Sequence, residues 1–438
     1  MTRNPEQPLL LHQVQLLEAE GAELRRCDVL IQAGRLMAIG GDAAAQATAC
    51  GAQVLDAQAW LLAPPLVDPH SELEDPATGS AESLASLERS ALAAGYGTVA
   101  LLPRASSWRD RPERLQGLTP LGRLQLLLWG SFSHGASGAD LAPHGDQLAA
   151  GAIGLAEADQ IPPLALLERG LSLGECGDAP VLLAPRDASL SQGGFVREGV
   201  EALRAGWPTD PSISETLPLQ NLLAMARRHP QRRVQLMNLS TEGGVALLRD
   251  LPAEQRPEAT VCWWHLLADS GSLDPIAEGW RVVPPLGTPA DRQALQQALA
   301  DGVLTAVAVH HQALDAEEQL LPLDQRRPGL AGHGLVLPML WQELVEGRGW
   351  TPAQLWQALC WGPGRFLGLE PEVLAPGSRR WILFDPGRPW PEAGPGAAAG
   401  CGSRAANRPG PLGAARGVVV ASGLSEPQSW SLPGGPLR

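Results

Sequence analysis

The chain has 438 residues, of which 44 % are hydrophobic and 18 % charged, a composition typical of a globular protein with a large core. A formal net charge of −14 argues against a nucleic-acid or anionic-membrane surface, and no apolar run is long enough to cross a bilayer. The chain has no lysine, which excludes a lysine Schiff base and a carboxylated-lysine metal bridge. The six cysteines are scattered singly and the first residues do not resemble a signal peptide, so we expect free thiols and a cytoplasmic location.

The first part of the chain differs in pattern from the rest. Residues 1–62 show short alternating segments punctuated by glycine, which predict strands of a small β-subdomain. From residue 63 onward, apolar segments alternate with amphipathic helical ones, as a parallel (β/α)8 TIM barrel over 63–369 requires. A doubly wound open sheet is the alternative, but the glycine-rich phosphate turn of such folds is missing after the first strand. The strand candidates of the barrel are 61–70, 97–104, 123–132, 151–159, 179–187, 232–240, 259–267 and 304–311.

The end of the chain again predicts strands. They would rejoin the N-terminal strands, so we predict a composite β-subdomain formed by 1–62 and 370–438. A Pro/Gly/Ala-rich stretch, 389–414, predicts a surface loop between the last two strands. The elements predicted here are helices over 334–347 and 351–369 and strands over 379–386 and 415–423.

Most of the strand candidates end in polar residues, and the chemistry of such a barrel takes place at these strand ends. The first candidate leads into VDPHSELEDPATG, which resembles the D-x-H-x-H-L-R-E-P-G motif of the dihydroorotase branch of the cyclic amidohydrolases. Further segments resemble this family in the same order over roughly 60–420: AAGYGTV, LLPR, SQGGFVREG, GWPTDPSISETLPLQNLLAMA, NLSTEGGVALLRD, VVPPLGTPADRQALQQALADGVLTAVAVHH and LAPGSRRWILFDP. The resemblance implies a zinc-dependent barrel with a small β-sandwich built from both chain ends.

The resemblance also implies where metal ligands should lie. Such a site uses imidazoles and carboxylates around two zinc ions, which acidify a bridging water. The first histidine of the first motif is His70, but the second is replaced by Glu72. The carboxylate after the fourth strand falls on or next to Glu157.

Three further family positions are substituted. The histidines after the fifth and sixth strands are Pro185 and Asn238, and the aspartate after the eighth strand, which binds metal and shuttles the proton, is His310. Proline has no donor side chain, so a two-metal site is not expected. The remaining candidate ligands, for a single zinc at most, are His70, Glu72, Glu157 and His310, with His311 beside the last.

The positions that the resemblance assigns to substrate binding are also substituted. The family's arginine and asparagine for the substrate carboxylate correspond to Glu74 and Arg104 here. A carboxylate in place of a guanidinium repels an anionic substrate, although a swapped Glu74–Arg104 pair would restore a positive charge. The loop after the seventh strand lacks the family's asparagine and arginine, at Val283 and Gly287.

Each candidate ligand can also be explained by a role that involves no metal. His70 would then be a hydrogen-bonded remnant, His310 and His311 an exposed pair at a strand end, and Asn238 a partner of loop backbone. Glu72 and Glu157 would be solvated or paired carboxylates.

Two functional hypotheses therefore remain open. We predict a non-catalytic dihydroorotase-like pseudoenzyme of the pyrimidine-biosynthesis family, kept for folding, assembly or regulation, because metal-site and substrate-site residues are lost together. The resemblance implies aspartate carbamoyltransferase as a partner, since some non-catalytic family members scaffold that enzyme, and it implies a homo-oligomer. The alternative is an active dihydroorotase or related cyclic amide hydrolase with a mononuclear zinc site and His310 as a catalytic residue.

Overall fold

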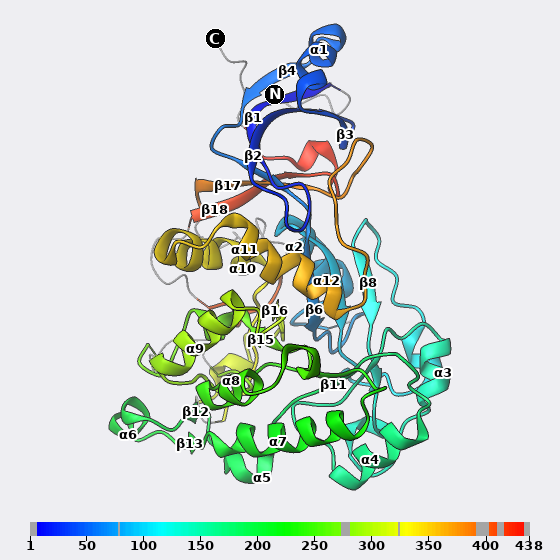
Figure 1. Ribbon diagram of the computed structural model, residues 1–438, viewed down its shortest axis with the longest axis vertical. Helices are drawn as coiled ribbons and strands as arrows, with labels where there is room; N and C mark the ends of the chain where they lie inside the picture. Colours follow the sequence, from blue (N-terminus) through cyan, green and yellow to red (C-terminus); the bar gives the residue numbers. More distant parts are fainter. Residues whose placement is uncertain are drawn as a thin grey trace.

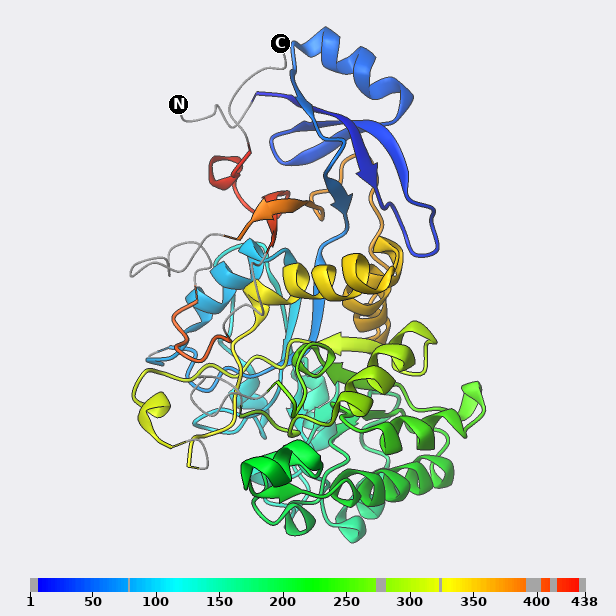
Figure 2. The ribbon, with the colours of Figure 1, turned by 90° about the vertical axis from the view of Figure 1, so that its left-hand side faces the viewer.

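The computed structural model describes residues 7–77, 79–272, 281–322, 325–390, 403–409 and 416–432. Strands from the beginning and end of these ranges lie together at one end of the molecule, and the parallel strands with most helices lie at the other (Figures 1 and 2). Five described cysteines, Cys27, Cys50, Cys176, Cys262 and Cys360, are free. No described helix combines the length and apolar character that crossing a membrane requires.

Strands from both ends of the chain form one seven-stranded sheet, the terminal sheet. Its order is β18-β17-β5-β1-β2-β3, with β4 beside β1. β1 is antiparallel to β2 and parallel to β4 and β5, while β17 is antiparallel to both β5 and β18. The sheet buries its own core, which includes Trp60 and Trp381. Its strands are β1 (Leu9–Leu16), β2 (Arg25–Gln32), β3 (Arg35–Ile39), β4 (Gln53–Asp56), β5 (Leu61–Ala63), β17 (Ile382–Pro389) and β18 (Arg416–Ser422).

The prediction of strands alone in the first 62 residues was incomplete. Residues Gly41–Cys50 form helix α1, which covers the sheet through Ala43 and Ala47. The segment is alanine-rich, which favours a helix, and it ends at Gly51 with a φ of 65°, the left-handed conformation that glycine adopts at little cost.

Parallel strands form the centre of the larger part of the molecule. They are hydrogen-bonded in three sheets rather than one continuous ladder: β6-β7-β8, β9-β10-β11-β14 and β15-β16. An isolated bridge between Leu236 and Ala259 links the second sheet to the third. The ends of β16 and β6 meet through His310 N–H, which donates to the His70 carbonyl at 3.1 Å. These central strands are β6 (Leu66–Ser71), β7 (Tyr96–Leu101), β8 (Gln125–Leu128), β9 (Gly130–Ser131), β10 (Leu155–Ala156), β11 (Val181–Leu183), β14 (Val234–Leu236), β15 (Thr260–Cys262) and β16 (Ala306–Ala308).

All eight predicted strand segments thus contain a short parallel strand, and the predicted helices lie between them. The strands are shorter than expected because the residues after them leave the ladder to form the polar strand ends. Capping boxes at Thr288 and Thr351 start two of the helices, each with proline in the first turn, as helix N-termini favour. The helices are α2 (Leu84–Ala93), α3 (His144–Ala149), α4 (Leu164–Leu173), α5 (Ala188–Ser191), α6 (Val200–Ala205), α7 (Ile213–Arg228), α8 (Glu242–Arg249), α9 (Pro289–Ala300), α10 (His333–Leu340), α11 (Pro352–Trp356) and α12 (Gly362–Phe366).

Two smaller features complete the path of the chain. A short parallel pair, β12 (Val196–Arg197) and β13 (Thr209–Asp210), lies beside α6 and α7.

Most of the predicted surface loop 389–414 lies outside the described residues, but the described part of it, 403–409, is not all exposed. Asn407 is buried, accepts the Leu314 N–H at 2.9 Å and donates to the Gln312 carbonyl at 2.8 Å. Because its polar groups pair with backbone beyond β16, this segment packs onto the strand ends despite its loop-like composition.

Candidate functional site

His70 and His310 meet at the carboxyl ends of β6 and β16. Their Nδ1 atoms lie 3.2 Å apart, and both side chains are buried. The site therefore brings together two of the four predicted ligands. Burial and the neighbouring His310 hold the pKa of His70 well below its usual range, and burial also lowers the pKa of His310. Both imidazoles are consequently neutral near pH 7.

The hydrogen bonds around this pair assign its protons. Thr260 Oγ1 accepts the Asn238 N–H at 2.9 Å and lies 2.9 Å from His70 Nε2. Thr260 has no other acceptor for its proton among the described residues, so the hydroxyl donates to His70 Nε2. His70 then carries its hydrogen on Nδ1 and donates to His310 Nδ1. This leaves the hydrogen of His310 on Nε2, an atom that has no partner among the described residues.

Two further histidines lie behind this pair. His333 Nε2 is 3.0 Å from Asp68 Oδ2, and His311 Nε2 is 3.5 Å from a carboxylate oxygen of Glu82. Asp68 also accepts the Val309 N–H at 3.0 Å. The interpretation of His310 and His311 as an exposed pair was wrong, because only 5 % and 1 % of them are accessible. Glu82 and Gly332, from the segments that follow β6 and β16, both contact the His311 ring.

The carboxylate of Glu72 pairs with an arginine. Arg104 Nε lies 3.3 Å from Glu72, and the same guanidinium lies 2.7 Å from Asp159. We call Arg104, Glu72 and Asp159 the Arg104 triad. Burial raises the pKa of Glu72 to about 7, and the charge of Asp159 adds to this effect while Arg104 opposes it. A protein cation thus already lies between the two carboxylates of the site.

The remaining predicted acidic residues lie elsewhere. Both oxygens of Glu157 are bonded to Ser133, to its N–H at 3.0 Å and its hydroxyl at 2.8 Å, and burial raises the pKa of this carboxyl. Glu74 is half-exposed and pairs with Arg327 at 2.6 Å, so the swapped Glu74–Arg104 pair is not formed. Glu72 is thus paired with Arg104, and Glu157 is hydrogen-bonded to Ser133. In the segment after the fourth predicted strand, the carboxylate that contacts Arg104 is Asp159.

Pro185 and Asn238 line one small cavity, together with Asp159 and Val283. Its volume is about 10 Å³, which is the space that one water molecule needs. Asn238 was predicted to bond loop backbone, but its Oδ1 is buried without a partner among the described residues. At Gly287 a Cβ would lie 2.6 Å from the Cβ of Asp291, so this position has little room for the long side chain of the family's arginine.

A larger cleft of about 390 Å³ opens beside the Arg104 triad. Its charges are almost all negative, with Arg327 as the single basic residue among the lining side chains. A cleft of this charge repels a substrate that carries a carboxylate. The acidic residues that line it are Glu72, Glu74, Asp75, Glu82, Asp315 and Glu318.

These residues do not fit a zinc ion. A histidine ligand must present a free nitrogen lone pair, whereas both nitrogens of His70 and Nδ1 of His310 are engaged with each other or with Thr260. The two carboxylates of the Arg104 triad are both paired with one guanidinium. Within the described ranges, no three His, Cys, Asp or Glu side chains are placed to hold a metal ion.

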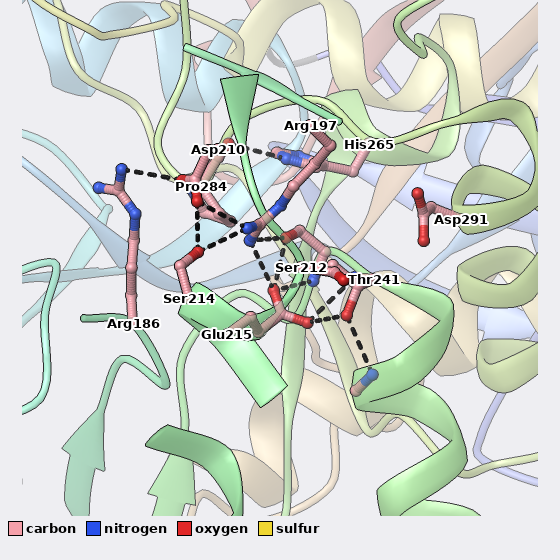
Figure 3. A network of polar contacts seen from close by, with 12 residues as sticks. Arg186, Arg197, Asp210, Ser212, Ser214, Glu215, Thr241, His265, Pro284 and Asp291 are labelled. Atoms are coloured by element: carbon pink, nitrogen blue, oxygen red, sulfur yellow. Dashed lines mark hydrogen bonds and ion pairs between the residues drawn. The ribbon is translucent and has the colours of Figure 1, made fainter. Parts of the chain in front are cut away.

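A second polar cluster lies next to the Pro185 cavity, and we call it the Glu215 network. Figure 3 shows Arg197 reaching between Asp210 and Glu215, which it contacts at 3.2 Å each. Glu215 also accepts the N–H and hydroxyl groups of Ser240 and Thr241, at 2.5–3.0 Å. Its side chain is almost fully buried, and the network joins β12, β13, the start of α7 and the residues after β14.

Sequence reasoning missed several residues of these clusters. Asp159, Thr260 and His333 had no metal-ligand spacing, and Glu82 lies in a helix-start sequence that predicts only a cap. One signal was available for Asp159, which lies two residues after Glu157 in the same strand end. Asp68 next to His333 and His311 next to Glu82 come from segments distant in the chain, so no local pattern could identify these pairs.

Comparison with solved structures defines the class of fold. The chain is similar to an L-hydantoinase (dihydropyrimidinase) from Arthrobacter aurescens, with a TM-score of 0.74 and 17 % identity over 94 % of this chain and 93 % of the other. It is also similar to a D-hydantoinase (dihydropyrimidinase) from Thermus sp., with a TM-score of 0.72, 17 % identity and coverages of 94 % and 93 %. The fold is therefore the mixed α/β fold of the hydantoinases.

Sequence comparison is more specific. The chain is 34 % identical over 415 residues to a probable dihydroorotase-like protein from Synechocystis sp.. This alignment covers 86 % of this chain and 92 % of the relative. It is 30 % identical to a dihydroorotase from Thermus aquaticus (86 % and 90 % covered) and 28 % identical to a dihydroorotase-like protein from Pseudomonas aeruginosa (82 % and 85 %). No protein-family model matches the sequence. The chain belongs to the dihydroorotase family of cyclic amidohydrolases, as the motifs predicted.

Proposed function

We propose that this chain is a non-catalytic dihydroorotase-like protein whose metal site is closed by its own side chains. The observation that carries the proposal is the Arg104 triad, in which a guanidinium bridges the carboxylates of Glu72 and Asp159. A metal cation in the same place would meet an immobile positive charge instead of free carboxylates. The mutual hydrogen bond of His70 and His310 engages the Nδ1 atoms of both imidazoles at the same time.

The surroundings of the site support the same proposal. The cavity at Pro185 and Asn238 has room for about one water, and the larger cleft is acidic. A small anionic substrate such as dihydroorotate would find no space in the cavity, and the one basic residue among the lining side chains of the cleft, Arg327, is already paired with Glu74 and Glu318. The function of the protein then depends on its fold and surface rather than on turnover.

The proposal extends to architecture and partners. We propose that the eight central strand positions close into a (β/α)8 barrel, since β16 and β6 meet through backbone bonds between their ends. We further propose that the protein is a cytoplasmic homo-oligomer that scaffolds or regulates another enzyme of pyrimidine biosynthesis, with aspartate carbamoyltransferase as the partner. Its resemblance to non-catalytic members of the family supports this choice.

Metal analysis combined with an activity assay tests the catalytic part. Purified protein is incubated with zinc, desalted and analysed for metal, and ring opening of dihydroorotate is followed in parallel with the Thermus aquaticus dihydroorotase as positive control. We expect far less than one zinc per chain and no turnover above the buffer rate. One zinc per chain with turnover that His70→Ala abolishes would overturn the proposal in favour of an active mononuclear enzyme.

Gel filtration with aspartate carbamoyltransferase from the same organism tests the partner. We expect both chains to elute together at a mass above that of either alone. Separate elution under all mixing ratios would refute the scaffold role while leaving the catalytic result to stand on its own.

A further inference from the structure

Three arginines from distant parts of the sequence meet where the terminal sheet joins the rest of the molecule. Arg35 begins β3, Arg123 precedes β8 and Arg379 precedes β17. Backbone hydrogen bonds build this junction: Leu36 N–H donates to the Ser378 carbonyl at 3.0 Å. We call Arg35, Arg123 and Arg379 the arginine patch.

Two of the guanidinium groups are held in place by backbone carbonyls. Arg35 Nη1 donates to the Gly377 carbonyl at 3.0 Å, and Arg123 Nη1 donates to the Gly423 carbonyl at 3.2 Å. Each of these groups uses only part of its fork of five N–H donors, so further donors are available for a ligand. All three arginines are at least partly exposed to solvent.

The third guanidinium lies at the same turn. A Cβ added to Gly34, which precedes Arg35 and has a φ of 75°, would lie 3.0 Å from Arg379 Nη1 and 3.8 Å from the Gly423 carbonyl. Gly34, the carbonyl that binds Arg123 and the Arg379 guanidinium are therefore immediate neighbours. The absence of a Cβ at Gly34 leaves room for Arg379 to lie against the turn.

The charge of this patch is not balanced. Glu426 pairs with Arg123 at 2.9 Å, but its side chain is 65 % exposed, and the Arg379 guanidinium makes no hydrogen bond or ion pair with any described residue. Burial and the repulsion from Arg123 and Arg35 lower the pKa of Arg379. The chain as a whole has a net charge of −14. Three arginines with one acidic neighbour therefore form a local excess of positive charge on a protein that is otherwise rich in carboxylates.

We propose that the arginine patch binds a small phosphate-class oxyanion, either inorganic phosphate or the phosphate group of a small metabolite. Guanidinium groups match the oxygens of such an anion in paired hydrogen bonds, and its double charge offsets the excess of the patch. The site is independent of the strand-end cluster and of the proposed lack of catalysis. It would bridge the terminal sheet and the larger part of the molecule, because its arginines come from both.

Isothermal titration calorimetry with sodium phosphate and with ribose 5-phosphate, at equal ionic strength and against sodium chloride, tests the proposal on the full-length protein. We expect binding of at least one phosphate compound in the millimolar range or tighter, and the stronger of the two identifies the source of the anion. Arg379→Ala and Arg35→Ala should each weaken the binding about tenfold, because each removes a charge-assisted contact. Glu426→Gln should strengthen it, since it removes the competing carboxylate.

Arg249→Ala is the matched control, because this arginine lies on α8 in an exposed pair with Asp301 and should leave phosphate affinity unchanged. Thermal melts without phosphate verify that each variant is folded. Absence of binding at millimolar phosphate, or equal affinity in the Arg379→Ala and Arg249→Ala variants, would overturn the proposal.

Discussion

Two buried polar clusters lie side by side at the strand ends, and they differ in how completely the groups at their centres are paired. In the Glu215 network, both carboxylate oxygens accept several hydrogen bonds and face a buried arginine. Around His70 and His310, by contrast, His310 Nε2 and Asn238 Oδ1 are buried without partners among the described residues. Buried polar groups in proteins are nearly always paired. Arg197 Nε in the Glu215 network also has no partner among the described residues, but the carboxylate at the centre of that network is fully paired, whereas His310 at the centre of the second cluster is not.

The difference separates a cluster that is complete at its centre without any ligand from one that is not. The Glu215 network needs only protein groups, and it holds the loops after β12, β13 and β14 in place. The strand-end cluster retains positions that the family uses for metal, and here they are filled by the His70–His310 pair and the Arg104 triad. The Glu215 network is therefore held by protein groups alone, while the strand-end cluster leaves two buried polar atoms without partners among the described residues.

The largest expected effect is in the Glu215 network. Glu215→Ala leaves the buried charge of Arg197 with one carboxylate fewer and strips acceptors from Ser240 and Thr241. We expect the free energy of unfolding to fall by about 3–5 kcal/mol, as for other broken buried pairs, measured by urea denaturation. Asp301→Asn is the control, since it removes an exposed pair with Arg249 and should cost less than about 1 kcal/mol. Equal effects of the two substitutions would show that the network is not the more stabilising element.

The Arg104 triad should make stability depend on pH. The pKa of Glu72 is raised from 4.5 to about 7 in the folded protein. Between these values the unfolded chain releases the proton and the folded protein keeps it, so the contribution of Glu72 to stability is highest below pH 4.5 and is lost as the pH rises to 7. The loss amounts to about 3 kcal/mol.

Glu72→Gln should remove this contribution and flatten the free energy of unfolding between pH 5 and pH 7.5, measured by urea denaturation at each pH. Glu74→Gln is the control, because Glu74 is half-exposed in its pair with Arg327. A pH profile of the Glu72 variant that parallels the wild type would refute the assignment of a raised pKa to this group.

The smallest effect is expected beside the incomplete cluster. The Tyr96 ring packs edge-on against His333 at 5.1 Å, and its hydroxyl is buried without a partner among the described residues. Removing an unpaired buried hydroxyl costs nothing and can relieve its desolvation. Tyr96→Phe should therefore leave the free energy of unfolding unchanged or raise it by up to about 1 kcal/mol in urea denaturation. A clear loss of stability would mean that the hydroxyl has a partner and that the two clusters differ less in their pairing.

Much of the frame could be predicted because its signals are local. Each predicted central strand is a short apolar run before a polar end, and the helices carry their own caps, as at Thr288 and Thr351. Helix α1 was missed because its alanine-rich sequence lies in a region whose overall pattern indicates alternating strands. The segment around Asn407 was predicted to be surface because glycine and proline dominate its composition, while its buried hydrogen bonds are made to residues about 90 positions earlier.

The sequence by itself determined the family of this protein, because the order of its motifs can be read directly along the chain. It placed His70 and His310 at strand ends, and the tertiary structure brought their rings to 3.2 Å. Only the tertiary structure decided what fills the site: that Arg104 joins Glu72 to Asp159, that Glu74 turns to Arg327, and that both histidines are covered. Those outcomes depend on contacts between loops far apart in the chain, where burial and the pairing of opposite charges select one partner among several.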